Sequence, residues 1–428
     1  MKRTVIAAVL GCFIFLSMAA KYSYAGEIDL LLQKLVEKGV LTAGEAQQVK
    51  IETKEEIKKE ISQAKYDLLP EWLQRVKFKG DFRLRYEGKR ERGAKDENMG
   101  KIRLRQGVEV KVNDQMKAGF GLATGTTSNP RSTNVTFGGT SGTPASFKDI
   151  TVDYAYGSYS PRTWITMTGG KFKNPIWQPT DLLWDGDLNP EGGNVQLDYR
   201  LNPYFGTFLN AMAFVMAYDS NRGSDTVMWA VQPGIKYNWK DKVDLKAAVT
   251  AYMFTNLKGK AKYSKQSTNS LNSSSEYKYN YNSVNPSVEI GIRDPFVAFP
   301  LLAKYIPYAG IYSDYIYNPD PATGKSGFDA GLKFGAEKVG DWGQWQAKVL
   351  YAKLGRDAFL DILPDSDRYS GKTNMKSLEF VLEYGLGKNT SIALDYYWAK
   401  SLSAQTSGGA AGSYIPQQLI QVDWNLKW

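Results

Sequence analysis

The residues best placed to do chemistry are four arginines, spaced two apart in two segments. Arg83 and Arg85 lie in "VKFKGDFRLRYEG", and Arg103 and Arg105 lie in "KIRLRQ". Side chains two apart on a strand share a face, so these arginines, together with Lys79, would form one basic wall. If the segments pair symmetrically about their connection, Arg83 lies opposite Arg105 and Arg85 opposite Arg103. Like charges so placed destabilise a sheet, and the basic wall therefore requires counter-charges or a purpose.

Counter-charges are available in one long connection, residues 173–192. Its stretch "TDLLWDGD" supplies three aspartates and an indole: Asp181, Trp184, Asp185 and Asp187. We expect the aspartates to face the basic wall across a constriction, where opposed charges would create a transverse field that orients polar solutes. The alternative is that the arginines are solvated and the aspartates only form turns. Trp184 and Trp177 either wedge this connection in place or contact solutes.

The composition excludes most catalytic chemistry. Among 428 residues there is no histidine, and the only cysteine is Cys12. A Ser-His-Asp triad, histidine acid–base catalysis and a histidine-containing zinc site are therefore excluded. We expect no catalytic residue, no metal, no cofactor and no enzyme activity. The net charge of +10 alternates with apolar residues along strands, which is not the pattern of a nucleic-acid-binding patch.

The N-terminal part differs in texture from the rest of the chain. Lys2 and Arg3 precede an apolar run, and "SYA" predicts removal of a signal peptide, residues 1–25. Residues 26–70 are expected to form a periplasmic helical segment, because "EIDLLLQKLVEKG" has helical spacing and "TAGE" is a capping box. Within this segment, residues 27–66 either assemble protomers or contact the cell wall, or they form a solvated helix or plug.

From residue 76 onward the chain repeats one unit, an alternating segment followed by a connection. Sixteen such segments are predicted: 76–87, 101–113, 116–125, 148–159, 163–172, 193–201, 206–218, 226–239, 243–254, 282–293, 304–318, 326–338, 343–356, 374–387, 390–401 and 417–428. The connections alternate between short ones, such as "NDQ" and "KDK", and long ones, such as 126–147 and 255–281. Short turns on one rim and long loops on the other are typical of outer-membrane barrels.

The faces of these segments support a membrane barrel. Apolar residues such as Phe78, Leu104 and Leu382 alternate with charged ones, and no later segment approaches the roughly 20 apolar residues of a membrane helix. Aromatic residues near segment ends, among them Tyr154 and Tyr156, would form interfacial girdles. We expect residues 71–428 to be all-β, a 16-stranded antiparallel transmembrane β-barrel, following a short N-terminal α-helical extension.

The last segment, "QLIQVDWNLKW", carries apolar residues at every second position and an aromatic final residue. It resembles the C-terminal targeting strand of outer-membrane proteins. We expect Trp424, Leu426 and Trp428 to be the signal that the barrel assembly machinery recognises.

Three longer motifs carry a family resemblance. They are "LLQKLVEKGVLTAGEA", "LPEWLQRVKFKGDFRLRYEG" and "GGKFKNPIWQPTDLLWDGDLNPEGGNVQLDY". Their order after a signal peptide resembles the putative porin family of Gram-negative outer membranes. The resemblance implies a 16-stranded diffusion pore in the outer membrane, in contact with lipid and lipopolysaccharide and assembled as a homotrimer. It does not supply a solute.

These observations predict a porin for the passive diffusion of small hydrophilic solutes, with a mild anion preference. Sixteen strands leave a lumen wide enough for water, and more basic than acidic residues are expected to line it. Two alternatives stay open. One is an anion-specific porin of the phosphate type, which would need a ladder of basic residues along the pore. The other is a barrel scaffold that sheathes a partner protein.

Overall fold

The computed structural model describes residues 70–138, 144–220, 224–263, 267–403 and 415–428. The chain divides into two compact units, Met1–Gln74 and Arg75–Trp428. In the first unit, the described residues include one short helix, α4 (Glu71–Gln74). The predicted signal peptide and the helical stretch 27–66 lie outside the described residues.

The described part of the second unit is dominated by seventeen strands. They are β1 (Val76–Glu91), β2 (Glu97–Lys111), β3 (Met116–Thr124), β4 (Val135–Thr136), β5 (Ile150–Arg162), β6 (Ile165–Lys171), β7 (Glu191–Arg200), β8 (Phe205–Ala217), β9 (Thr226–Trp239), β10 (Val243–Thr255), β11 (Ser283–Arg293), β12 (Tyr308–Tyr317), β13 (Ser326–Gly335), β14 (Trp345–Leu354), β15 (Met375–Gly387), β16 (Thr390–Ser401) and β17 (Pro416–Lys427). Two short helices accompany them: α5 (Pro300–Tyr305) and the 3₁₀ helix η2 (Arg368–Gly371).

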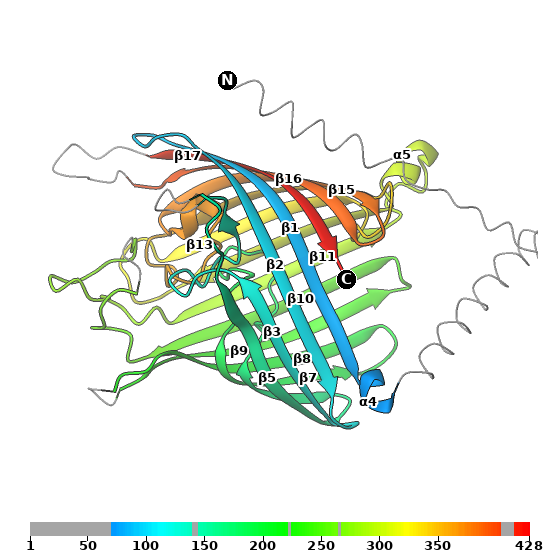
Figure 1. Cartoon of the computed structure of the whole chain (residues 1–428), viewed down its shortest axis with the longest axis horizontal. Coiled ribbons are helices and arrows are strands. Elements are labelled where there is room, and N and C mark those ends of the chain that lie inside the picture. Colours follow the sequence, from blue (N-terminus) through cyan, green and yellow to red (C-terminus); the bar gives the residue numbers. More distant parts are fainter. Residues whose placement is uncertain (1–69, 139–143, 221–223, 264–266, 404–414) are drawn as a thin grey trace, which may run out of the picture. The chain divides into compact units, whose positions relative to one another are not determined.

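These strands form a closed antiparallel barrel. Each long strand pairs with the next along the chain, and β17 returns to pair with β1, beside which it lies in Figure 1. The two-residue strand β4 only adds to one end of β2, so the wall has sixteen strands, as predicted. Closure leaves no unpaired sheet edge, which hydrocarbon could not hydrate.

The two rims of the barrel differ as the connection lengths predict. Tight turns such as 112–115 and 388–389 form the short-turn rim, and four long loops stand out at the other. These are L2 (125–149), L3 (172–190), L5 (256–282) and L7 (355–374), each bounded by two wall strands. Among the described residues, no helix is both long and apolar enough to cross a membrane.

Two predicted strand starts lie four residues from the observed ones. One is that of β2, which begins at Glu97 and not at residue 101. In the other, the segment expected from residue 304 begins as helix α5, and β12 starts only at Tyr308. Pro300 occupies the first helical turn, where its missing N–H costs nothing. The helix ends at Tyr305, and its C-cap residue, Ile306, directly precedes Pro307. The two prolines therefore turn a short connection into a helical one.

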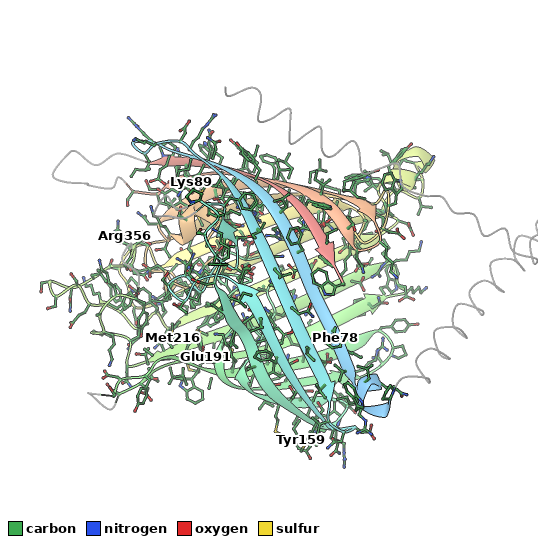
Figure 2. All side chains as sticks on the ribbon, viewed as in Figure 1. Phe78, Lys89, Tyr159, Glu191, Met216 and Arg356 are labelled. Carbon is green, nitrogen blue, oxygen red and sulfur yellow. The ribbon has the colours of Figure 1, made fainter. Side chains whose placement is uncertain are left out.

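The wall is inverted relative to a soluble protein. Phe78 and Leu382 are 59% and 49% exposed on the outer face, whereas Arg85 and Asp329 are 3% and 0% exposed inside. Figure 2 shows Phe78 and Tyr159 extending outward from the barrel. Apolar side chains outside and charged side chains inside are what a lipid-embedded barrel requires.

Two aromatic residues face the opposite way from the expected girdle. The Tyr156 hydroxyl donates to the inward carboxylate of Glu109 at 3.2 Å, so this side chain points into the lumen. Its ring lies over Gly119, and that of Tyr154 over Gly121, where a Cβ atom would come within 2.5 and 2.3 Å of the respective rings. Because glycine has no side chain, the inner wall is flat at these two positions, and both tyrosine rings can lie against the wall.

Candidate functional site

The basic wall forms on β1 and β2, but its register differs from the predicted one. The observed cross-strand pairs are Arg83–Arg103, Arg85–Lys101 and Arg105–Asp81. The expected pairs, Arg83 with Arg105 and Arg85 with Arg103, are therefore wrong by two residues. The last two residues of β1 pair with β17 and not with β2. The centre about which β1 and β2 pair therefore lies closer to the N-terminus than predicted. This register keeps two like-charge pairs, Arg83–Arg103 and Arg85–Lys101, but places Asp81 beside two arginines.

Asp81 is the first counter-charge of the basic wall. Its carboxylate lies 2.8 Å from Nη2 of Arg103 and 2.7 Å from Nε of Arg105. A single carboxylate on the wall itself thus contacts two guanidinium groups. Asp81 was not among the predicted counter-charges, although it lies on the inward face of the same segment as the arginines of β1.

Asp423 is the second counter-charge, and it comes from the far end of the chain. It lies opposite Arg85 across the β1–β17 closure, and its carboxylate is 2.7 Å from Nε of Arg85 and 3.2 Å from Nε of Arg83. Arg85 also reaches Asp367 of L7 at 3.0 Å. In contrast, Lys79 forms no ion pair with any described residue. Each of the four arginines therefore contacts a wall carboxylate, and the loops supply two further counter-charges, Asp187 and Asp367.

Of the three L3 aspartates, only Asp187 contacts the basic wall. It lies 3.1 Å from Nη1 of Arg105 and accepts hydrogen bonds from the backbone N–H and the hydroxyl of Thr133 in L2, at 2.9 and 2.8 Å. Burial by itself would raise the pKa of Asp187, but Arg103, Arg105 and the Thr133 bonds outweigh it and lower that pKa. Asp187 is thus an ionised link between L2, L3 and β2.

Asp185 and Asp181 serve contacts within the loops instead. Asp185 accepts the backbone N–H groups of Asp187 and Ser366, at 2.9 and 2.8 Å, which joins L3 to L7. Burial raises the pKa of Asp185 to about 7. Asp181 pairs with Arg368 of L7 at 2.7 Å. Neither carboxylate has an ion pair with the basic wall among the described contacts.

Arg368 is a buried cation that sequence reasoning missed. It is 2% exposed, and its Nη2 group meets both Asp181 and Glu379 on β15. Burial opposes its charge, but the carboxylates of Asp181, Glu379 and Asp365 outweigh that and raise the pKa of Arg368. Because Arg368 lies in a loop without periodicity, no pattern in the sequence distinguished it from a solvated arginine.

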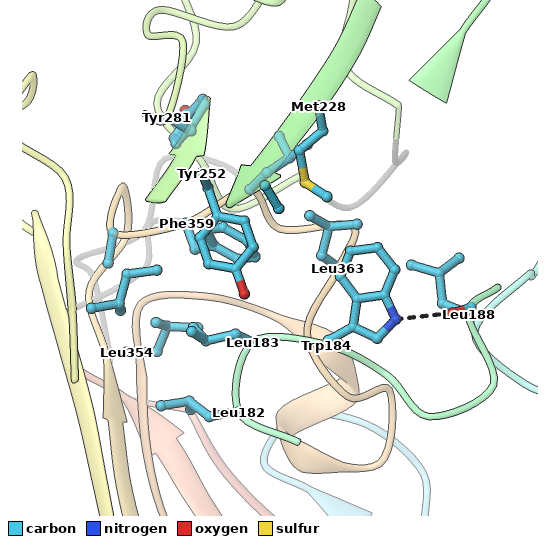
Figure 3. Packing of buried hydrophobic residues seen from close by; sticks show 14 of the residues in the cluster. Leu182, Leu183, Trp184, Leu188, Met228, Tyr252, Tyr281, Leu354, Phe359 and Leu363 are labelled. Carbon is cyan, nitrogen blue, oxygen red and sulfur yellow. Dashed lines mark hydrogen bonds between the residues drawn. The ribbon is translucent and has the colours of Figure 1, made fainter. Parts of the chain in front are cut away.

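An apolar core lies among the loops and the inner wall. Leu182, Leu183 and Trp184 of L3 belong to the same buried cluster as Phe359 and Leu363 of L7, which is shown in Figure 3. Trp184 is 5% exposed, and its Nε1–H donates to the carbonyl of Leu188 at 2.9 Å. Of the two roles expected for Trp184, packing is therefore the one that its surroundings favour. L3 and L7 form one packed body rather than independent loops.

L3 is also fastened to the wall at its start. The side-chain amide of Gln232 on β9 accepts the backbone N–H of Trp177 at 2.8 Å and donates to the Trp177 carbonyl at 2.7 Å. Farther along, the Thr180 hydroxyl lies 2.9 Å from Asp314 and 2.5 Å from Asp329, on β12 and β13. Because these wall side chains point inward, L3 crosses the lumen between opposite parts of the barrel.

Comparison with known proteins agrees with this geometry. A family model described as putative porin matches residues 44–100, 91–290 and 307–427. The chain belongs to the putative porin family. No curated protein matches it closely enough to count as a relative.

Solved porin structures resemble this porin in fold. Pseudomonas putida OprB, in a structure at high pH, has 7% sequence identity and a TM-score of 0.51, covering 82% of this chain and 94% of that one. Vibrio cholerae OmpT, in a trimer form, has 12% identity and a TM-score of 0.43, with 82% and 99% coverage. A mutant of the Rhodopseudomonas blastica porin has 9% identity and a TM-score of 0.45, with 82% and 100% coverage. The likeness to OprB supports the fold and, at 7% identity, nothing beyond the fold.

Family membership and the inverted barrel place this porin in the outer membrane of a Gram-negative bacterium, where it is a channel. No cluster of three or more potential metal ligands occurs in the part of the chain that the structure describes.

The predicted C-terminal signal residues lie along the closure of the porin barrel. Trp424 packs edge-on against Phe82 of β1, with ring centroids 6.4 Å apart, and Leu426 lies opposite the same phenylalanine. Trp428 exchanges backbone hydrogen bonds with Gly80, at 3.0 and 3.1 Å. A Cβ atom on Gly80 would come 2.5 Å from the Trp428 ring, so the indole can pack here because residue 80 is glycine.

Proposed function

We propose that this porin lets small hydrophilic solutes diffuse passively across the outer membrane, with a mild preference for anions. One observation carries the anion preference. Lys77, Lys79 and Lys117 point into the lumen near the short-turn rim, and none of them forms an ion pair with a described residue. The four arginines, in contrast, are compensated by Asp81, Asp423, Asp187 and Asp367. These three lysines outnumber Glu109, the inward carboxylate opposite Lys77, and an excess of cations at a pore mouth attracts anions.

The same pairing favours a mild preference over a dedicated anion channel. Carboxylates interleave with the cations of the basic wall, and Glu87 also pairs with Lys101 at 2.7 Å. A continuous ladder of free basic residues, which a phosphate-type porin would need, is not formed by these strands. The anion-specific alternative is thus the weaker proposal.

We also propose that L3 forms the constriction of the pore. Its support is the contact between Asp187 and Arg105 at 3.1 Å and the two anchors of L3 on the far wall. The opposed charges of Asp187 and the arginines would create a transverse field next to the passage. The measurement is the reversal potential of the Arg83→Ala/Arg105→Ala variant, which should shift toward cations. An unchanged reversal potential would place the selectivity of the pore elsewhere.

Liposome swelling tests the diffusion function itself. Proteoliposomes diluted into isotonic sugars should swell at a rate that falls steeply as the sugar becomes larger. No swelling with any solute, from protein whose barrel is folded, would contradict passive diffusion and support the scaffold alternative. The homotrimer, lipopolysaccharide and assembly-machinery partners stay predictions, and native mass spectrometry of detergent-extracted protein tests the trimer.

A further inference from the structure

The inner wall near the short-turn rim contains a pocket of about 530 Å³. Its volume falls within the range of small-molecule sites. Charged and aromatic side chains of β7 to β13 line it, among them Arg200, Tyr204, Lys236, Lys246, Arg293 and Tyr308. The pocket is separate from the basic wall on β1 and β2.

Most charges around this pocket are paired. Lys236 lies 2.5 Å from Asp198, Arg293 lies 2.6 Å from Asp244, and Lys333 lies 3.1 Å from Glu289. Arg293 also meets Glu337, at 3.2 Å. All four carboxylates that line the pocket are thus engaged, which leaves them poorly suited to bind a cationic solute.

Lys246 and Arg200 are the exceptions, because none of the ion pairs among the described residues includes either of them. Lys246 lies between Lys236 on β9 and the engaged Glu289 on β11. Its ammonium group is instead 4.5 Å from the ring centroid of Trp177 and 5.1 Å from that of Phe208. Cation–π contacts stabilise an ammonium group but do not neutralise it. The positive charges of Lys246 and Arg200 are therefore available to an anion.

The two rings beside Lys246 are fixed in place. Trp177 is held through both backbone groups by Gln232, and it meets Phe208 edge-on, with centroids 6.5 Å apart. The Phe208 ring lies over Gly234, where a Cβ atom would come within 2.2 Å of the ring. The two rings adjoin the pocket through Lys246 and do not line it themselves. Phe208 is 7% exposed, whereas Trp177 is half-buried, so a solute beside Lys246 would meet the preformed ring of Trp177, which lowers the entropic cost of binding.

We propose that this pocket is a binding site for small aromatic carboxylates on their way through the pore. The carboxylate pairs with the Lys246 ammonium group, and the ring of the solute packs against Trp177 at the edge of the pocket. Two cations without an ion pair, among carboxylates that are all engaged, favour an anion over a cation. The inference rests on the proposed diffusion function, for which it supplies a solute class.

Benzoate is the probe. Acetate is a control compound that carries the charge without the ring, and benzyl alcohol is a control compound that carries the ring without the charge. Isothermal titration calorimetry on detergent-solubilised protein should show saturable binding of benzoate, at least tenfold tighter than that of either control compound. Lys246→Met should weaken benzoate at least tenfold, with Lys246→Gln as a second variant. Lys348→Met is the matched control, because Lys348 also faces the lumen but forms neither an ion pair nor a cation–π contact with a described residue. It should stay within twofold of wild type.

Benzoate binding no tighter than that of acetate, or equal in wild type and Lys246→Met, would overturn the site. Single-channel current in KCl separates this inference from the proposed function, because it is measured without benzoate. A conducting pore without saturable benzoate binding refutes the site alone. A folded barrel without current refutes the pore, whatever benzoate does.

Discussion

Gln232 should act as the latch that holds the start of L3 against the wall. Its side chain is fully buried and makes four hydrogen bonds, two to the backbone of Trp177 and one each to Asn210 and Thr250. At about 1 kcal/mol net for each bond, Gln232→Ala would cost about 4 kcal/mol, of which about 2 kcal/mol belongs to the loop itself. A loss of about 2 kcal/mol makes local opening of L3 about thirtyfold more frequent.

Hydrogen exchange followed by mass spectrometry measures this opening directly. Peptides that cover residues 173–180 should exchange about thirtyfold faster in Gln232→Ala than in wild type, and the open-channel current should become noisier. Gln196→Ala is the matched control, because Gln196 also faces the lumen but makes one long contact, 3.4 Å, to Asn210. If L3 exchanged equally fast in both variants, the latch would not exist.

Three further perturbations test other parts of the structure. Burial raises the pKa of Asp185 to about 7 from an ordinary value of about 3.9. Between these two pH values the folded loop keeps a proton on Asp185 that the open loop would release. The contact between L3 and L7 therefore weakens, by up to about 4 kcal/mol, as pH rises from about 3.9 to about 7. Current noise should be greater at pH 8 than at pH 5, and less so in Asp185→Asn; an equal difference in both proteins would refute this role. On the outer face, Leu382→Arg should destabilise the barrel by about 2 to 4 kcal/mol in urea unfolding, whereas the lumen-facing Val381→Arg should cost far less, and equal costs would contradict the orientation of β15. Trp428→Ala should lower the yield of heat-resistant barrel on gels while Trp398→Ala does not, and equal yields would argue against a role of the closing indole in assembly.

The wall of the barrel could be predicted from the sequence because each strand carries its own evidence. Alternation sets which face of a strand meets lipid, and no distant residue is needed to see it. The prediction was wrong where that local pattern was interrupted. Prolines replaced the start of β12 with a helix, and an irregular register between β3 and β5, at Gly121, accompanies the inward rings of Tyr154 and Tyr156.

The candidate site was harder to predict because its contacts join distant parts of the chain. Arg85 meets Asp423 across 338 positions, a pairing that appears only when the last strand closes on the first. The arginines were recognisable from their spacing, but their partners were not. The L3 and L7 residues, including Asp181 and Arg368, pair inside loops, where no periodicity indicates which side chains face each other.

Reversal potential in planar bilayers under a KCl gradient tests the central claim most directly. The wild-type protein should conduct stably, with a reversal potential that favours chloride. The variant Lys77→Gln/Lys79→Gln/Lys117→Gln should keep the conductance pathway but lose most of that preference. A folded barrel that carries no current, or a wild-type pore that prefers potassium, would contradict the account of a water-filled, mildly anion-selective channel.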